Sequence, residues 1–397
     1  MLGVKYAHIH TVNYRYRRVL TYVEKKIKDG LRKTSVVKNM PARSPSISWR
    51  ENYLRTVEFR EPEYIPCRIT VMWPLWNTYR EKLEEIALKH PLVFPGFKPG
   101  GVKYGVKPGV LRADRTVKDP FRCVWSFNIE GFQGQVVHHP LENWENFRDY
   151  EMPDPEDGVP VEGAEKPIPW NSIFSGLDRA RAEGDLIVAG MPHGFFFQRL
   201  YYLRGFTNLM KDLIQKPPQI YELIERLTEF NLKLVDKFLE SGKIDVFNFG
   251  DDLGTQTRMP ISPRTFREFI FPSYAKIFQK IRRRGIHVYL HTDGHVVEAL
   301  NQLMDAGVSI LNIQDRVNGL DNIASICKGR VCVDLDIDRQ YLVPFGRSED
   351  IKNYIKRVAG LLAMRRGGFM LEAEIHPPTP LENIEAVANA MEESMWF

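Results

Sequence analysis

An apolar run in the C-terminal half of the chain ends directly against ionisable side chains. Val288 to Leu290 are apolar, and His291, Asp293 and His295 follow them closely. Side chains two apart on a strand point to the same side, so His291 and Asp293 can present a pair of groups to one cavity. An imidazole and a carboxylate placed in this way can bind a divalent metal ion or move a proton. We expect His295 in the first turn of the next helix, behind the site or on the surface.

Two other predicted strands end in acidic residues. Asp251 and Asp252 follow one apolar run, and Glu372 and Glu374 end another. Helix capping explains any one of these acids as well as chemistry does, but together with the histidines they supply the nitrogen and oxygen donors of a divalent-metal site. The predicted metal ligands are His291, Asp293, Glu372, Glu374 and His376. The predicted catalytic residues are Asp251, Asp252 and His291.

Alternating strand and helix patterns must position these residues. The predicted strands are 65–71, 186–189, 246–249, 288–290, 310–313, 331–335 and 369–371, and the predicted helices include 219–241, 262–284, 296–306 and 348–366. Repeated strand–helix units imply a parallel sheet. The length of the series favours a closed (β/α)8 TIM barrel over an open doubly wound sheet, and no Gly-x-Gly-x-x-Gly follows a strand. Because the carboxyl ends of barrel strands build the active site, we expect the polar strand ends at one rim.

The barrel is predicted over 48–397, with a long early insertion at about 75–175 and a basic extension at 1–47. The insertion is rich in Gly and Pro, interrupts the strand–helix rhythm and is expected to cover the barrel mouth. The first 39 residues hold ten Lys and Arg against Glu24 and Asp29. A solvated helix or tail is the simpler interpretation of this extension, and contact with nucleic acid or an anionic membrane is the alternative.

Aromatic residues and one more histidine are candidates for substrate binding. Trp73, Trp76 and Trp125 belong to the insertion region, and Tyr289 precedes His291 by two residues. These rings could form an apolar pocket, although core packing is the simpler interpretation of any one of them. His193 follows Gly-Met-Pro at the end of a predicted strand, so we expect it at the rim as a substrate-binding residue.

The composition is that of a globular chain without a membrane span. The 397 residues are 43% hydrophobic and 26% charged, and no run of about 18 apolar residues could cross a bilayer. The four cysteines do not form a disulfide framework and the N-terminus has no secretory signal pattern, so we expect a cytoplasmic location. A homodimer is the commonest state for such an enzyme.

Several sequence blocks resemble one family along most of the chain, from residue 53 to 391. They are IPCRITV (65–71), GDDLGTQ (250–256), ISPRTFREF (261–269), LHTDG (290–294), GGFM (367–370) and PTPLENI (378–384). In this order they resemble the uroporphyrinogen decarboxylase-like superfamily, which includes uroporphyrinogen decarboxylases and corrinoid-dependent methyltransferases. The resemblance implies a (β/α)8 barrel, in agreement with the periodicity.

The sequence departs from both branches of this superfamily at functional positions. Decarboxylases carry an arginine-rich segment after the first strand that grips the substrate carboxylates, but residues 72–79 read MWPLWNTY. Thiol-directed methyltransferases bind zinc through a His-x-Cys pair and a later Cys. Here His291 matches the histidine, Asp293 replaces the first cysteine, and Ala373 or Glu374 replaces the second. A His/Asp/Glu set is harder than a His/Cys/Cys set and suits an oxygen-bearing substrate better than a thiol.

The resemblance therefore implies a zinc-dependent methyltransferase, a demethylase of methoxy-type compounds, that passes the methyl group to cobalamin on a separate corrinoid protein. Zinc on His291, Asp293 and Glu374 would act as a Lewis acid. One alternative is a metal-free decarboxylase or lyase of a small carboxylated substrate, with Asp251 or Asp252 facing a cationic intermediate. Another is a non-catalytic protein that works through its basic N-terminus. We do not expect nucleic acid to be the main partner.

Overall fold

The computed structural model describes residues 44–105 and 112–397. These residues form two compact units. The first unit contains described residues 105, 112–178 and 187–335, and the second contains 44–104, 179–186 and 336–397. The predicted basic extension lies outside the described residues except for 44–47.

Five strands run through the first unit, in the spatial order β9-β8-β7-β6-β5. They are β5 Val188–His193, β6 Val246–Gly250, β7 His287–Thr292, β8 Ile310–Gln314 and β9 Cys332–Asp336, the last residue of which belongs to the second unit. β5 with β6, β6 with β7, and β7 with β8 are parallel pairs. Every residue of β8 and β9 is buried, as expected for parallel strands that are covered on both faces.

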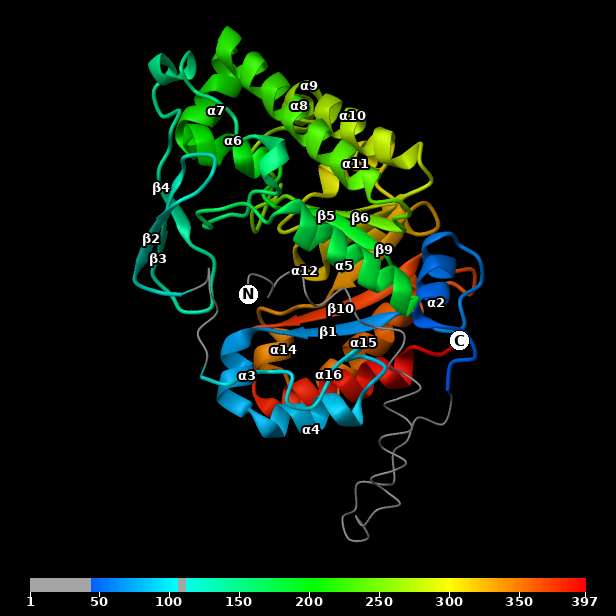
Figure 1. Ribbon diagram of the computed structural model, residues 1–397. Helices are drawn as coiled ribbons and strands as arrows, with labels where there is room; N and C mark the ends of the chain where they lie inside the picture. The colour runs from blue at the N-terminus through cyan, green and yellow to red at the C-terminus, as the bar shows by residue number, and fades with distance from the viewer. Residues whose placement is uncertain (1–43, 106–111) are drawn as a thin grey trace. The chain divides into compact units, whose positions relative to one another are not determined.

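Helices connect these strands (Figure 1). They are α5 Trp170–Glu183, α6 Phe197–Arg204, α7 Phe206–Gln215, α8 Pro218–Glu240, α9 Pro263–Phe269, α10 Phe271–Arg282, α11 Leu300–Ala306, α12 Asp315–Asn318 and α13 Leu320–Cys327. The helix predicted over 262–284 is instead two helices with a joint at Ile270. Pro272 explains this break, because proline has no amide hydrogen and its ring clashes with the preceding turn. Ser262 starts α9 by accepting a hydrogen bond from the amide of Thr265.

The insertion contributes a separate antiparallel sheet to the first unit, in the order β2-β3-β4. Its strands are β2 Arg115–Lys118, β3 Val124–Phe127 and β4 Gln135–His138. Short 3-10 turns follow at 144–147 and 155–157. Trp125 and Phe127 point into a buried core, so this sheet packs through one face and leaves β4 mostly exposed.

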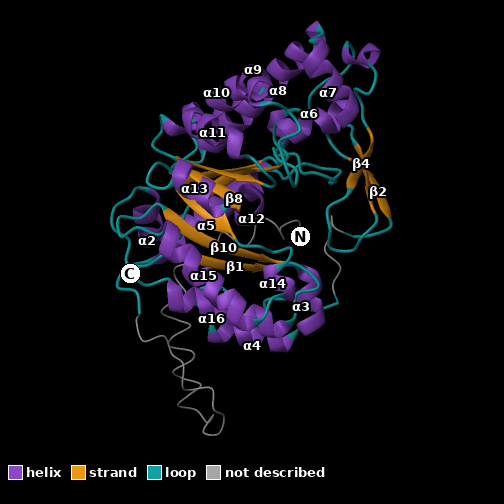
Figure 2. Cartoon of the chain, turned by 180° about the vertical axis from the view of Figure 1, so that it is seen from behind, coloured by secondary structure: helices purple, strands orange, loops and turns teal. Residues whose placement is uncertain are grey.

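Two parallel strands form the centre of the second unit, β1 Cys67–Val71 and β10 Phe369–Ile375. Its helices are α2 Trp49–Val57, α3 Trp73–Tyr79, α4 Glu81–Lys89, α14 Leu342–Phe345, α15 Ser348–Leu362 and α16 Leu381–Ser394. α16 packs on both strands and α15 packs on α16 (Figure 2). The buried face of α16 includes Ile384, Val387 and Met391, which recur at helical spacing.

The predicted α/β class is confirmed, because seven strands of the described residues alternate with helices along the chain and their pairs are parallel where registers are defined. Each predicted strand is present, and most bounds differ by one or two residues. The largest shifts are at β5, which ends at His193 instead of at residue 189, and at β10, which continues to Ile375.

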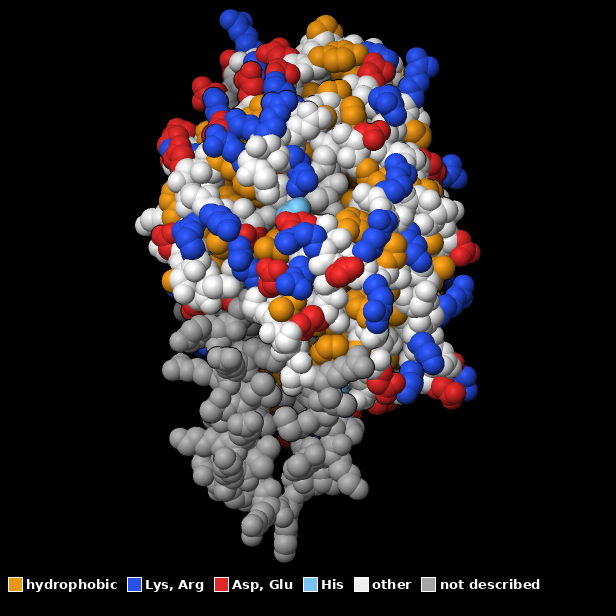
Figure 3. Space-filling view, turned by 90° about the vertical axis from the view of Figure 1, so that its right-hand side faces the viewer, with side chains coloured by type: hydrophobic (Ala, Val, Ile, Leu, Met, Phe, Trp, Pro, Cys, Tyr) orange, Lys and Arg blue, Asp and Glu red, His pale blue; other side chains and the backbone are white. Residues whose placement is uncertain are grey.

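Charged side chains of both signs are scattered over the face drawn in Figure 3.

Candidate metal centre

The carboxyl ends of β5, β6 and β7 bring three titratable side chains of the first unit together. His193 is the last residue of β5, Asp252 lies two residues beyond β6, and His291 is the penultimate residue of β7. Gly250 at the end of β6 is in register with both His193 and His291. Parallel strands in register end at one edge, which places the three side chains side by side.

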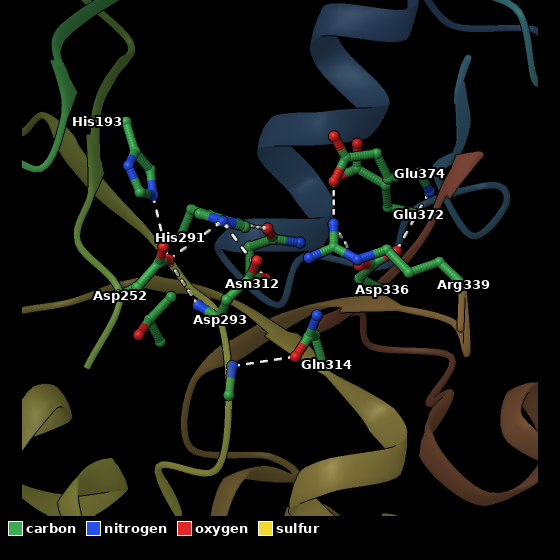
Figure 4. Close-up of polar contacts among 12 residues, drawn as sticks. His193, Asp252, His291, Asp293, Asn312, Gln314, Asp336, Arg339, Glu372 and Glu374 are labelled. Carbon is green, nitrogen blue, oxygen red and sulfur yellow. Dashed lines mark hydrogen bonds and ion pairs between the residues drawn. The ribbon is translucent and has the colours of Figure 1, made fainter. Parts of the chain in front are cut away.

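The ligand atoms of His193, Asp252 and His291 all lie within 4.8 Å of one another, and all three residues are half-buried. His193 Nε2 is 3.1 Å from Asp252 Oδ1, and His291 Nε2 is 3.8 Å from the same oxygen (Figure 4). Donor atoms around a tetrahedral zinc ion lie about 3.3 Å apart, given metal–ligand bonds of about 2.0–2.1 Å. Two imidazoles and one carboxylate at this spacing fit a divalent metal and leave a coordination position open, as catalytic sites require.

Asn312 on β8 sets the tautomer of His291. The Asn312 amide nitrogen donates to the backbone oxygen of Asp334 over 2.9 Å, so its Oδ1 must face the histidine. His291 Nδ1 lies 2.5 Å from that oxygen and therefore donates a hydrogen to it. The Nε2 lone pair of His291 is then directed toward Asp252, which is the state that a metal ligand needs.

Asp252 is held in place through both of its carboxylate oxygens. Oδ1 accepts the amide hydrogen of Asp293 at 3.0 Å, and Oδ2 accepts a hydrogen bond from Gln198 Nε2 at 3.2 Å. Burial raises the pKa of Asp252, but the neighbouring His193 and His291 and the Asp293 amide outweigh burial and lower the pKa below its usual range. Asp252 is therefore an anion at neutral pH.

Glycines let the strand ends approach closely enough to form this cluster. A Cβ on Gly250 would lie 2.7 Å from the ring of His193, so only glycine leaves room for that imidazole. Gly294 has φ +84°, and a Cβ there would lie 2.3 Å from the backbone of Gly254. The loops after β6 and β7 are thus in backbone contact, which fixes Asp252 relative to Asp293 and His291.

Asp293 lies beside the cluster. Its Oδ1 is 3.6 Å from His291 Nε2, which makes it a fourth polar group within reach of a bound ligand. Its prediction as a direct metal ligand stays a prediction.

Asp251 faces a different set of partners. Its carboxylate accepts the amide hydrogens of Phe197 at 2.5 Å and Gln198 at 2.8 Å, and the hydroxyl of Tyr274 at 2.7 Å. Burial raises its pKa to about 6, although these hydrogen bonds oppose the shift. Asp251 thereby caps the start of α6 and joins it to α10, which is a positioning contact. A catalytic role for Asp251 stays a prediction.

The acidic residues predicted as ligands on β10 belong to the second unit and have cationic partners there. Glu372 pairs with Arg68 at 2.6 Å. Glu374 pairs with Arg339, which also lies 3.3 Å from Asp336. His376 Nε2 is 3.5 Å from Glu374 Oε2. Ligation of a metal by Glu372, Glu374 or His376 stays a prediction, and any metal there would compete with these arginines.

The aromatic candidates make packing contacts. Trp125 is 1% exposed and donates from Nε1 to Asp119 at 2.8 Å. Trp76 stacks on Phe97, with 5.3 Å between ring centroids. The hydroxyl of Tyr289 lies 3.1 Å from Asp334, and Trp73 is half-buried at the start of α3. Substrate binding by Trp73, Trp76, Trp125 and Tyr289 stays a prediction.

Two residues of this centre have no local sequence signal. Asn312 lies within a buried strand, and Gln198 lies in the second position of a helix whose start no capping pattern marks. His193 is recognisable at a strand end, but its pairing with Asp252 depends on the register between β5 and β6.

Comparison with known proteins agrees with the fold. Titratable groups at the carboxyl ends of parallel strands are the usual arrangement of a barrel enzyme. The chain belongs to the uroporphyrinogen decarboxylase (URO-D) family, whose model matches residues 127–394. The resemblance predicted from the sequence is therefore confirmed.

Individual relatives come from both kinds of enzyme. The chain is 24% identical to a uroporphyrinogen decarboxylase of Anaeromyxobacter sp. over 60% of its own length and 68% of that protein. It is 25% identical to methylcobamide:CoM methyltransferase MtaA of Methanosarcina barkeri over 48% of its own length and 54% of that protein. The structure is similar to a methyltransferase from Methanosarcina mazei, with a TM-score of 0.58 and 18% identity over 87% of this chain and 98% of that one. This likeness supports the barrel fold.

None of the described helices combines the length and apolar character needed to span a membrane.

Proposed function

We propose that this protein is a metal-dependent methyltransferase that moves a methyl group from a small methoxy-type substrate to a corrinoid protein. Its family consists of enzymes, and one of its relatives is a methylcobamide-dependent methyltransferase. The proposal includes zinc as the metal, cobalamin carried by a partner protein, a cytoplasmic location and a homodimeric state.

The observation that carries the proposal is the cluster of His193, Asp252 and His291. Its donors are nitrogen and oxygen atoms, and none of the four cysteines, which are buried and form no disulfide, belongs to the cluster. Such a donor set favours a metal that binds a substrate oxygen over one that binds and activates a thiol.

The residues of the site have different proposed roles. His193, Asp252 and His291 would hold the metal, which when bound supplies a Lewis acid for the substrate oxygen. Asn312 keeps the hydrogen of His291 on Nδ1 and its Nε2 available. Asp252 supplies a negative charge at neutral pH, because its pKa is lowered. Asp293 would accept a hydrogen bond from a donor group of the substrate, because its carboxylate oxygen lies 3.6 Å from His291 Nε2.

The test is methyl transfer with purified protein, zinc, reduced free cobalamin as the acceptor and a series of small methoxylated compounds. We expect methylcobalamin to form with at least one compound, and His291→Ala to slow its formation by about 100-fold or more, because loss of a ligand should cost more than the roughly 10–100-fold typical of a residue that only orients one. His138→Ala is the matched control, since His138 is an exposed histidine on β4 of the same unit. Equal rates for the protein and His291→Ala would contradict the proposal.

The decarboxylase relative supports a second candidate function, a metal-free decarboxylase or lyase. The lowered pKa of Asp252 suits a carboxylate that faces a cationic intermediate. Carbon dioxide release from a small carboxylated substrate by chelator-treated protein, without methyl transfer, would favour this function.

A further inference from the structure

Gln198 forms a closed pair of hydrogen bonds with Asp252. Its Oε1 accepts the Asp252 amide hydrogen at 2.8 Å, and its Nε2 donates to Asp252 Oδ2 at 3.2 Å. The oxygen and nitrogen ends of the amide are therefore assigned by their partners. Rotation of either side chain would break a contact, so Asp252 is held with Oδ1 facing the two imidazoles.

Gln198 and the residue that follows it make further buried contacts. Its own amide donates to the buried carboxylate of Asp251 at 2.8 Å, and its Nε2 also lies 3.2 Å from the hydroxyl of Tyr202. The next residue, Arg199, is buried against the insertion, where it lies 3.4 Å from Asp119 and 4.1 Å above the ring of Phe121.

We propose that Gln198 is a positioning residue that presents Asp252 to the metal and thereby sets the affinity of the His193–Asp252–His291 centre. This inference rests on the proposed function, since it requires that centre to hold a metal. Gln198 is only 5% exposed, and its side-chain Nε2 is hydrogen-bonded to Asp252 and Tyr202. It therefore acts on the metal through Asp252. Residues that orient a ligand in this way typically contribute a factor of about 10–100 to metal affinity.

The insertion has a corresponding role in this arrangement. Asp119 accepts hydrogen bonds from Trp125 Nε1 and from the Cys123 amide. Its Oδ2 also lies 3.4 Å from the guanidinium of Arg199. The turn of α6 that carries Gln198 is thus fixed to the loop after β6 by Asp251 and to the insertion by Asp119. The sheet of β2, β3 and β4 therefore helps to hold Gln198, the residue that orients Asp252.

The experiment is a zinc competition titration against a chromophoric chelator at neutral pH with the full chain. Gln198→Met keeps the volume but removes both hydrogen bonds to Asp252, and we expect it to weaken zinc affinity by about 10–100-fold. Tyr202→Phe is the matched control, because it removes the other partner of Nε2 and keeps Asp252 bonded, so its affinity should stay within about threefold of the original. The melting temperature of the metal-free proteins is recorded in parallel, because a merely structural role would lower it without a selective loss of zinc.

Zinc affinity of Gln198→Met within threefold of the original protein, with a cooperative melt, would overturn the inference. If Gln198→Met does not fold, Gln198→Ala provides the same comparison with no added bulk. A protein that binds no zinc before mutation would instead refute the proposed function, so the two failures are distinguishable.

Discussion

The hydrogen bond between His291 and Asn312 shows how one amide can prepare a metal ligand. A histidine binds a metal through a nitrogen that carries no hydrogen, and the partner of its other nitrogen decides which one that is. Asn312 fixes the tautomer of His291, because its own amide nitrogen already donates to the Asp334 carbonyl and only its oxygen can face the imidazole. The orientation of His291 therefore depends on a residue of the neighbouring strand.

We expect Asn312→Leu to weaken zinc binding by about 10–100-fold, because His291 loses the acceptor that fixes its tautomer. It should also lower the free energy of unfolding by about 1–3 kcal/mol, since the buried Asp334 carbonyl loses its donor. Zinc affinity follows from chelator competition and stability from urea unfolding.

Asn312→Asp is the control for this prediction. It keeps an oxygen acceptor beside His291 Nδ1, loses the donor to Asp334 and adds a negative charge that strengthens the acceptor, so it should bind zinc more tightly than Asn312→Leu. Equal affinity for the two variants would mean that the acceptor does not matter.

Sequence reasoning identified single residues better than their partners. His291 and Asp252 stand out because polar groups at strand ends need an explanation, and the structure places both in the same cluster. The sequence predicts substrate binding for His193, which stays a prediction, and the structure adds that its Nε2 lies 3.1 Å from Asp252. That distance depends on the β5–β6 register, which is a tertiary property, and a single sequence does not contain it.

At the scale of elements, the loops after β6 and β7 cross where two glycines meet. Gly254 and Gly294 are so close that a Cβ on either would lie within 2.6 Å of the backbone of the other loop. This contact keeps the two strand ends, and hence Asp252 and His291, at a fixed separation.

We expect Gly294→Ala to lower the free energy of unfolding by more than about 2 kcal/mol, because it combines backbone strain at positive φ with a clash against backbone. Gly285→Ala is the matched control, since Gly285 has a similar φ of +74° but open space around its Cβ position. That variant should lose only about 1 kcal/mol. The two are compared by chemical denaturation, and equal losses would show that the loop contact is not tight.

The order of strands and helices was predictable because hydrophobic periodicity reports burial directly. The residues at which the elements begin and end were less predictable. The long helix expected over 262–284 divides at Ile270 because Pro272 interrupts it, and β5 extends to His193 through Pro192 with an irregular register. These differences depend on local proline geometry and on pairing with neighbours, which outweigh periodicity.

At the scale of the whole molecule, family membership agrees with the fold predicted from periodicity. The matched region covers residues 127–394 and includes the three residues of the candidate metal centre. The resemblance predicts that Asp293 and Ala373 or Glu374 stand where a thiol-directed site has its cysteines, and this replacement stays a prediction. The sequence alone could name that replacement, but it could not choose among the acids at the ends of the strands.

The predicted donors belong to two different units of the chain. His193, Asp252 and His291 form a cluster in the first unit, and Glu374 pairs with Arg339 within the second unit. A carboxylate with a cationic partner must lose that partner before it can bind a metal, which lowers its contribution as a ligand.

The most direct test of the central claim is metal content by mass spectrometry on chelator-free protein, measured for the original chain, His193→Ala and Glu374→Ala. We expect about one zinc ion per chain in the original protein and in Glu374→Ala, and less than about a tenth of that in His193→Ala, because a three-ligand site loses most of its affinity when one ligand is removed. Zinc retained in His193→Ala but lost in Glu374→Ala would refute the proposed metal centre and assign the metal to the donors of β10.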